Sequence, residues 1–442
     1  FIRESGLHKP ASVNATPFWD SDFNFGVGII PTSIFTAGFF GLLAWGAILL
    51  VLLGLSMRLV RDSHLFSSEK ALFGLALISS SYLIAYHMIY TPGIAVTGTL
   101  FLLLGLLVVS AAGETPARAL RIGVNSISGG VRLLVLVCVV SAALIAALIL
   151  GREIASNMLV NRGAYMYQQN GNPEQAGAFI NTALAVAPKN DRAHRAAAEL
   201  GVIQLSKLIA ETTTDDEATR AKLQETLQGT IQHGLTAVSI NEASYQNWLL
   251  LAQVYSDLAG AQVEGSFAAA QNAYEKAYAA NPTNPVPKLR LAQLYALQGN
   301  RAAARTNLND AIALKPDFAA AHYLLSQVEA TDGKGEAAVA AASRAAQLVP
   351  SDPLGWFNLG YILYAGQAYR DAALSLQQAV SLAPDYSNAL FYLALSYNAL
   401  QLPNDAVLAL QRIAQLNPEE ASIPLIIQNI QAGRDPGAGL TQ

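Results

Sequence analysis

Residues 282–316, PTNPVPKLRLAQLYALQGNRAAARTNLNDAIALKP, contain one complete structural unit of this chain. Apolar and small residues recur at helical spacing on both sides of Gly299, which predicts two helices joined by a turn. Pro316 ends the second helix, because proline lacks the amide hydrogen that a continuing helix needs. The sequence therefore predicts a helical hairpin. The two contact faces contain Leu291, Ala292, Tyr295, Ala304, Leu308 and Ala311.

This hairpin recurs with a period of 34 residues. An earlier unit ends at Pro188, and a degenerate unit lies between Pro188 and Trp248, with a polar insertion at residues 212–216. One hairpin alone cannot bury its apolar face, so successive hairpins are expected to stack. The prolines that mark the period are Pro282, Pro316, Pro350, Pro384 and Pro418.

The period and the residues that recur within it, such as Trp356, Leu359 and Gly360 in one unit, resemble the tetratricopeptide repeat family over residues 157–420. The resemblance implies an all-α solenoid of about seven repeats whose chemistry is recognition of a partner. We expect this solenoid over residues 151–434, with a cap helix near residues 422–432 and a flexible tail at 435–442.

Only 13% of the residues of the chain are charged. Four long segments of the first third are almost free of charged residues. At about 1.5 Å per residue, each is long enough to cross a hydrocarbon core of roughly 30 Å. We predict a membrane module at residues 29–150 with four transmembrane helices, preceded at residues 1–28 by the end of an extracytoplasmic loop. Buried helices of a soluble protein are the alternative, but these are usually shorter and amphipathic. The predicted spans are 32–57, 71–90, 93–112 and 133–150.

Basic residues in the short connections predict the orientation of these spans. They cluster in the first and third connections, whereas the hairpin at residues 91–92 has none, and positive loops face the cytoplasm. The repeats would then be extracytoplasmic on a multi-pass protein of the bacterial cytoplasmic membrane, in contact with membrane lipid. Arg152 and Arg162 favour the opposite orientation. The basic residues of the connections are Arg58, Arg61, Lys70, Arg118, Arg121 and Arg132.

The membrane part has no proline or polar linker before the first repeat, so we expect the last span to continue into the solenoid as one helix. At the other end, the chain does not begin with Met and is expected to continue upstream. Asn14-Ala15-Thr16 matches a glycosylation triplet, followed by proline, and Trp19 is of a type suited to the membrane interface.

Residues 1–112 carry a second resemblance. A loop with Lys9-Pro10 and aromatic residues at 18–25 leads into TAGFFGLLAW at 36–45. This looks like the end of the large extracytoplasmic loop and the next helix of the O-antigen ligase and polymerase superfamily, in versions that carry tetratricopeptide repeats. The resemblance implies glycan transfer from a lipid-linked oligosaccharide, with proton removal from an acceptor hydroxyl. Val27 and Gly28 occupy the places where the family often has a His-Asn pair, so the catalytic groups are expected upstream of Phe1.

Three residues remain as weak catalytic candidates. Arg3 and His8 are the cationic side chains nearest to the family's diphosphate-binding loop, and solvated loop residues are the alternative. His87 lies near the outer end of the second predicted span, beside Tyr86 and Tyr90. It fits either an aromatic belt at the membrane interface or a proton-transfer role.

Other chemistry is not supported by the sequence. Cys138 is the only cysteine, and the six histidines lack metal-ligand spacing. Phosphate-binding loops and dinucleotide fingerprints are missing, and a net charge of −4 does not favour nucleic acid. We expect no metal, no cofactor and no nucleic-acid partner.

The solenoid groove should be lined by residues one and two turns along each first helix. Glutamine amides and aromatic rings at those positions suit a protein or extended peptide, or a glycan, whereas packing between repeats is the alternative for each ring. The cluster near Tyr361 is the best patch. The predicted groove residues are Gln253, Gln293, Tyr323, Gln327, Phe357, Tyr361, Tyr364 and Phe391.

Taken together, these patterns favour a portion of an O-antigen ligase- or polymerase-like envelope protein whose outward repeats bind a protein or glycan partner. A non-enzymatic, membrane-anchored scaffold for envelope complexes is the alternative, and a lipid-sugar-dependent protein glycosyltransferase is a third possibility. The sugar, the acceptor and the oligomeric state are left open by the sequence.

Overall fold

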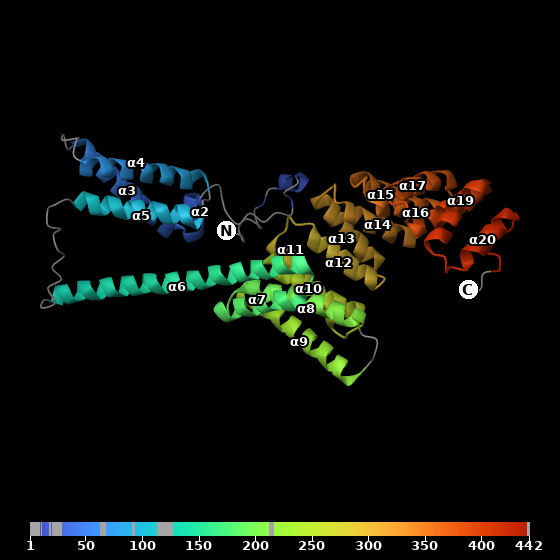
Figure 1. Cartoon of the computed structure of the whole chain (residues 1–442), viewed down its shortest axis with the longest axis horizontal. Helices are drawn as coiled ribbons and strands as arrows, with labels where there is room; N and C mark the ends of the chain where they lie inside the picture. Colours follow the sequence, from blue (N-terminus) through green and yellow to red (C-terminus); the bar gives the residue numbers. More distant parts are fainter. Residues whose placement is uncertain are drawn as a thin grey trace. The chain divides into compact units, whose positions relative to one another are not determined.

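The computed structural model describes residues 9, 11–16, 19, 29–61, 68–90, 93–112, 127–211 and 216–439. Within these ranges the chain forms helices and turns and no strand, which confirms the all-α prediction (Figure 1). The chain divides into two units. Unit 1 contains residues 1–8 and 21–244, and unit 2 contains residues 9–20 and 245–442, so the chain enters unit 2 twice.

Four apolar helices of unit 1 pack together: α2 (Ile29–Ala37), α3 (Phe39–Arg61), α4 (Ser68–Ile89) and α5 (Ile94–Ala112). Their common core contains Leu52, Leu77, Leu100 and Leu107. Many other large apolar side chains of these helices are exposed, including Leu50 and Leu102. An apolar exterior of this extent is typical of a surface that contacts lipid or another protein.

The predicted first span, residues 32–57, is not one helix. Gly38 has a φ of +56°, which ends α2 and starts α3. The two helices then lie so close that a Cβ on Gly41 would be 2.5 Å from the Ser33 carbonyl oxygen. The indole Nε1 of Trp45 donates a hydrogen bond to Ser33 Oγ at 2.6 Å. Hydropathy predicted the apolar stretch correctly but could not reveal this break.

Two helices among the described residues are long and apolar enough to cross a membrane, by length and composition only. They are Phe39–Met57 and Val140–Asn170, whereas the apolar helices Phe73–Ile89 and Val96–Leu107 are shorter. The four-span module therefore stays a prediction.

Helix α6 (Ile127–Asn170) is continuous for 44 residues, as the missing linker predicted. Its C-terminal part packs against α7 (Pro173–Val186), whose first turn is capped by Asn172 Oδ1, which accepts from the Gln175 amide at 3.0 Å. Helices α8 (Asp191–Glu211) and α9 (Glu217–Ile240) form the next hairpin. The polar insertion is largely outside the described residues.

Unit 2 continues the series with five further hairpins, giving seven in the described chain. Their helices are α10 (Tyr245–Gly260), α11 (Ser266–Ala280), α12 (Val286–Leu297), α13 (Arg301–Leu314), α14 (Ala319–Thr331), α15 (Gly335–Leu348), α16 (Pro353–Ala365), α17 (Tyr369–Leu382), α18 (Ser387–Ala399) and α19 (Pro403–Leu416). Helix α20 (Ser422–Gln431) covers α19 with Ile423, Ile426 and Ile430, as expected of a cap.

Small residues let the paired helices approach closely. Ala304 and Ala311 of α13 are fully buried against α12. A Cβ on Gly360 of α16 would lie 2.5 Å from Leu376 Cγ of α17, so a larger residue there would force the hairpin apart. The sequence pattern thus encodes the helix crossings directly.

The N-terminal loop contributes a short 3₁₀ helix, η1 (Ala11–Ala15), to unit 2. Trp19 packs against Phe318 of the solenoid, with ring centroids 5.5 Å apart. Asn14 of the glycosylation triplet is buried.

Candidate partner-binding surface

Seven aromatic side chains of α16, α17, α18 and the turn before α18 form a connected cluster, here called the aromatic strip. Tyr392 is its centre, with ring centroids 4.9 Å from Tyr361, 5.5 Å from Tyr364 and 6.1 Å from Phe357. Consecutive first helices place these rings side by side because the repeats stack in register. The members are Phe357, Tyr361, Tyr364, Tyr369, Tyr386, Phe391 and Tyr392.

The strip reaches toward the preceding repeat through Tyr386, whose ring lies 5.0 Å from Phe357. Burial raises the pKa of Tyr386, and the neighbouring Tyr323 and Asp352 raise it further. Tyr323 of α14 has its pKa raised by burial and by Asp352, while a hydrogen bond from Gln327 opposes this shift. Both phenols therefore keep their hydrogens near neutral pH.

The central tyrosines behave in the same way. Burial is the main cause that raises the pKa of Tyr364 and of Tyr392, and a neighbouring tyrosine adds to the shift in each. The strip thus offers ring faces and neutral hydroxyl groups, without a charged base or nucleophile of its own. Such a surface is suited to binding.

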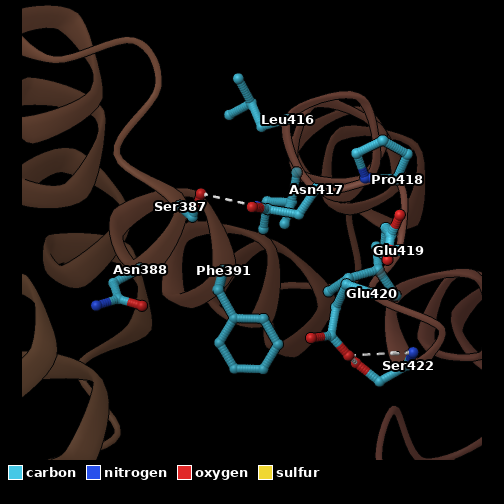
Figure 2. A pocket seen from close by; sticks show the side chains of 11 residues that line it. Ser387, Asn388, Phe391, Leu416, Asn417, Pro418, Glu419, Glu420 and Ser422 are labelled. Carbon is cyan, nitrogen blue, oxygen red and sulfur yellow. Dashed lines mark hydrogen bonds between the residues drawn. The ribbon is translucent and has the colours of Figure 1, made fainter. Parts of the chain in front are cut away.

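One end of the strip opens into a pocket of about 770 Å³ between α18, α19 and α20 (Figure 2). Phe391 lines it together with Asn388 and two carboxylates, Glu419 and Glu420. Ser422 Oγ donates to Glu420 Oε1 at 2.7 Å, and this contact lowers the pKa of Glu420. The pocket therefore combines an aromatic wall with an acidic rim.

Tyr361 lines a second pocket, of about 1020 Å³, together with other residues of α16, with α15, with the turn before α15 and with the turn after α16. Its other walls are largely apolar, with Val339, Ile362 and Leu363 among them. Tyr361 is 43% exposed, the most accessible ring of the aromatic strip. The strip thus connects two open pockets.

The predicted groove residues are only partly brought together. Phe357, Tyr361 and Tyr364 join one cluster, and Phe391 contacts it through Tyr392 at 5.6 Å. Tyr323 is not among these ring contacts and acts only on the pKa of Tyr386. No ligand tests their role, so binding stays a prediction. Sequence reasoning missed Tyr392, because neighbours along a helix point about 100° apart and only stacking of repeats shows which rings meet.

The predicted glutamines are more scattered. Gln253 is exposed on α10, and Gln293 on α12 accepts from an Arg290 guanidinium nitrogen at 3.0 Å. Gln327 is exposed on α14, next to Tyr323. Of the three, only Gln327 is linked to the aromatic strip.

His87 lies between α4 and α5 and is completely buried. Its Nδ1 is 2.6 Å from the Leu83 carbonyl oxygen, and its Nε2 is 3.1 Å from Thr97 Oγ1. A carbonyl oxygen only accepts, so Nδ1 carries a hydrogen in the contact with Leu83. Tyr86 and Tyr90 stack on each other outside this contact.

The other catalytic candidates, Arg3 and His8, lie outside the described residues. Among the residues that are described, no group of three or more His, Cys, Asp or Glu side chains is placed to hold a metal ion.

Two tetratricopeptide repeat profiles match this chain, at residues 264–328 and 356–421. A comparison with curated proteins found no match. Neither profile covers residues 1–112.

Solved structures resemble the solenoid at low identity. A tetratricopeptide repeat protein from Parabacteroides merdae is 14% identical, with 63% of this chain and 99% of that chain covered and a TM-score of 0.41. The structure of pilF from Pseudomonas aeruginosa is 16% identical, with 64% of this chain and 100% of that chain covered and a TM-score of 0.40. A MamA protein is 24% identical, with 38% of this chain and 93% of that chain covered and a TM-score of 0.33.

The profile matches agree with the hairpins, the 34-residue period and the small-residue crossings. The chain therefore contains tetratricopeptide repeats, which form an all-α solenoid of the kind that mediates protein–protein interaction.

Proposed function

We propose that this chain is a membrane-anchored recognition protein of the bacterial envelope, whose solenoid binds an extended segment of a protein partner along the aromatic strip. The observation that carries the proposal is the strip itself, which joins seven rings and two open pockets on one run of repeats. Ring faces pack on apolar side chains, and neutral phenols hydrogen-bond with a peptide backbone.

Membrane anchoring is supported by α3 and α6. Only 11% and 12% of their most apolar windows are buried within the protein, so these surfaces have no protein cover. The basic residues of the connections favour an extracytoplasmic solenoid. In this arrangement α6 runs without a break from the membrane into the first repeat.

We further propose that the membrane part belongs to a glycan-transfer protein of the O-antigen ligase or polymerase type. This rests on the sequence resemblance of residues 1–112. The solenoid would then hold a protein partner or acceptor near a site that uses a lipid-linked oligosaccharide. A non-enzymatic scaffold for envelope complexes is the competing proposal.

Peptide binding can be tested with the full chain in lipid nanodiscs. Tyr361→Ala and Tyr392→Ala should each weaken binding of selected peptides about tenfold, since an aromatic anchor is lost. Leu374→Ala is the matched control, because Leu374 is exposed on α17 outside the strip, and it should change binding less than about twofold. Equal losses in all three variants would reject the strip. Binding of glycans in place of peptides would assign it to sugar.

Anchoring and glycan transfer need separate measurements. Leu374→Cys in a Cys138→Ser background should react with an impermeant maleimide in intact spheroplasts, and reaction only after lysis would reverse the proposed orientation. Deletion of the gene should remove a polymer or glycoconjugate from the envelope mass profile. An unchanged glycan profile, with loss of protein complexes, would leave the scaffold.

A further inference from the structure

The loop segment Lys9–Trp19 packs on two turns of the solenoid, the one before α12 and the one before α14. Its contacts join residues about 270 to 300 positions apart in the chain and all lie within unit 2. They consist of one buried amide, one buried ammonium group and one ring pair.

Asn14 is the most deeply buried side chain of the segment, at 2% exposure. Its Nδ2 donates two hydrogen bonds, to the Thr283 carbonyl oxygen at 2.8 Å and to the Leu314 carbonyl oxygen at 2.9 Å. These carbonyl groups lie at the two ends of one repeat, beside successive turns between repeats. Only an amide side chain offers two hydrogens on one nitrogen at this reach, and a carboxylate would meet two carbonyl dipoles with the wrong charge.

Lys315 holds the segment from the other side. Its Nζ donates to the Asn14 backbone oxygen at 2.9 Å and to Asp317 Oδ1 at 2.8 Å. It also lies 5.0 Å from the centroid of the Trp19 ring. The lysine is nearly buried, so these partners replace the water that a free ammonium group would bind.

The segment is folded to present these groups together. Thr16 Oγ1 donates to the Val13 carbonyl oxygen at 2.7 Å, and the Trp19 amide donates to the Thr16 carbonyl oxygen at 3.2 Å. Lys9 Nζ donates to the Trp19 carbonyl oxygen, which closes the loop. Trp19 then lies against Phe318 of the solenoid.

The repeat sequence makes this junction unlike the others. The positions equivalent to Lys315 contain no other cation, and only one position equivalent to Phe318 carries another aromatic ring. No other junction combines a lysine with a ring. The residues equivalent to Lys315 are Ala187, Asn241, Asn281, Val349, Ala383 and Asn417, and those equivalent to Phe318 are Asn190, Ser244, Asn284, Asp352, Tyr386 and Glu420.

We infer that the turns at Thr283 and at residues 314–318 form a second peptide-recognition site of the solenoid, independent of the aromatic strip. The site recognises an asparagine amide and a tryptophan five positions later. Its occupant is the Lys9–Trp19 segment of this chain.

The test uses the full chain in lipid nanodiscs and a fluorescent peptide, KPASVNATPFWD, with the sequence of residues 9–20. Asn14→Asp with Trp19→Ala in the protein should vacate the site, because both anchoring groups of the resident segment are lost. Peptide anisotropy should then show saturable binding, about tenfold tighter than binding to the wild-type chain, whose own segment competes. A peptide with aspartate in place of its asparagine should bind about tenfold more weakly.

The matched pair of lysine variants locates the site. In the vacated protein, Lys315→Met should weaken peptide binding about tenfold. Lys189→Met, an exposed lysine in the corresponding turn of the first repeat, should change it less than about twofold.

Three results would overturn the proposal: no saturable binding to the vacated protein, equal binding to the vacated and wild-type proteins, or equal effects of the two lysine variants. Hydrogen exchange gives an independent check on the intact chain. Asn14→Asp alone should speed exchange of the amides in residues 281–284 and 314–318 about tenfold, and unchanged rates would show that the segment is not docked there.

Discussion

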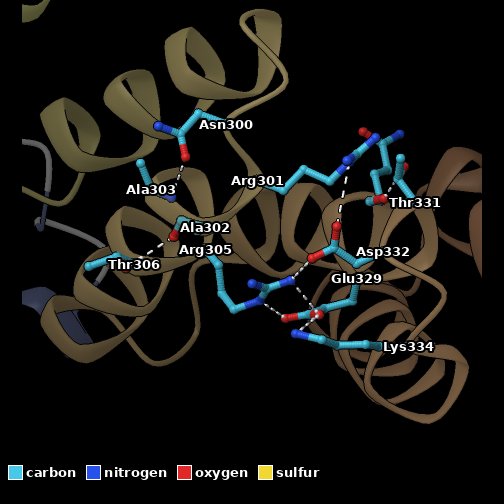
Figure 3. Close-up of polar contacts among 11 residues, drawn as sticks. Asn300, Arg301, Ala302, Ala303, Arg305, Thr306, Glu329, Thr331, Asp332 and Lys334 are labelled. Atoms are coloured by element: carbon cyan, nitrogen blue, oxygen red, sulfur yellow. Dashed lines mark hydrogen bonds and ion pairs between the residues drawn. The ribbon is translucent and has the colours of Figure 1, made fainter.

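Five positions of the repeat are charged at one junction and small or apolar 34 residues later. In the charged set, Arg305 Nε lies 2.5 Å from Glu329 Oε1, and its terminal nitrogen pairs with Asp332 (Figure 3). The equivalent five residues of the next repeat all line the 1020 Å³ pocket beside Tyr361. The charged set is Arg301, Arg305, Glu329, Asp332 and Lys334, and its equivalents are Gly335, Val339, Leu363, Gly366 and Ala368.

This difference shows that the repeat backbone does not determine which junctions between helices are filled and which contain a pocket. Long side chains that pair with each other span the junction of α13 with α14 and α15. Where the same positions are Val, Leu, Gly and Ala, nothing reaches across and a pocket is left. A recognition surface can therefore arise in one repeat without any change of fold.

The largest effect is expected from Arg305→Leu. Glu329 is only 8% exposed and would lose a bidentate partner, so the local opening free energy of α13–α15 should fall by about 3 kcal/mol. Native-state hydrogen exchange measures this. Arg301→Leu is the control, because Arg301 is 45% exposed and 3.5 Å from Asp332, and it should cost less than about 1 kcal/mol. Similar losses in both variants would contradict the central role of Arg305.

The next largest effect on stability is expected when the charged pair is introduced at the equivalent positions of the following repeat. Leu363→Glu alone should destabilise α15–α17 by about 2 kcal/mol, since a half-buried apolar side chain becomes an unpaired carboxylate. Adding Val339→Arg should recover about 1 kcal/mol, because it rebuilds the Arg305–Glu329 pair at the equivalent positions. A double-mutant cycle by thermal unfolding measures the coupling. Strictly additive losses would mean that the two junctions differ in backbone as well as in side chains.

A smaller effect should appear on acidification. The Arg305 hydrogen bond holds the pKa of Glu329 below its ordinary value of 4.5. A lowered pKa in the fold means that the carboxylate stabilises the protein above pH 4.5 and that this contribution is lost as the pH falls through the folded value. The thermal midpoint should therefore fall more between about pH 6 and about pH 4 in the wild type than in Glu329→Gln. An equal difference in the two proteins would rule out this carboxylate as the cause.

The smallest effect is expected at the histidine pair between α8 and α9. His194 Nδ1 and His233 Nδ1 are 2.9 Å apart, and burial, with His194, lowers the pKa of His233 below 6.5. Because the fold favours the neutral ring, this contribution is complete above pH 6.5 and is lost as the pH falls below that value. His233→Gln should flatten the dependence of α8–α9 stability on pH in this range. Hydrogen exchange of wild type and variant, compared at each pH, measures this dependence. An unchanged slope of stability against pH in the variant would contradict the role of His233.

Local signals made much of the fold predictable. The period of 34 residues located the four hairpins from α12 to α19, because prolines and small residues at the crossings act within a single unit. The continuous α6 followed from the lack of a linker. The break at Gly38 did not follow, because an apolar stretch reads the same whether its helix is straight or folded back.

The candidate site was predictable only in part. The register of the first helices placed Phe357, Tyr361 and Tyr364 on one face, and the structure brings them together. Tyr392, which joins them, was missed, and so were the two pockets, because both depend on the angle between neighbouring repeats. The contact of Trp19 with Phe318 could not be predicted for a related reason, since the two residues lie about 300 positions apart.

The sequence by itself determined the all-α class, the repeat boundaries, the cap helix and the apolar stretches, because each depends on residues within one turn or one hairpin of each other. Tertiary structure alone decided which side chains meet across repeats: Arg305 with Glu329, Tyr392 with Tyr361, and Asn14 with the carbonyl groups of two turns. The physical reason is that helix and turn formation is local, whereas hydrogen bonds and ring contacts between distant residues depend on how the stacked hairpins and the returning loop are placed in space.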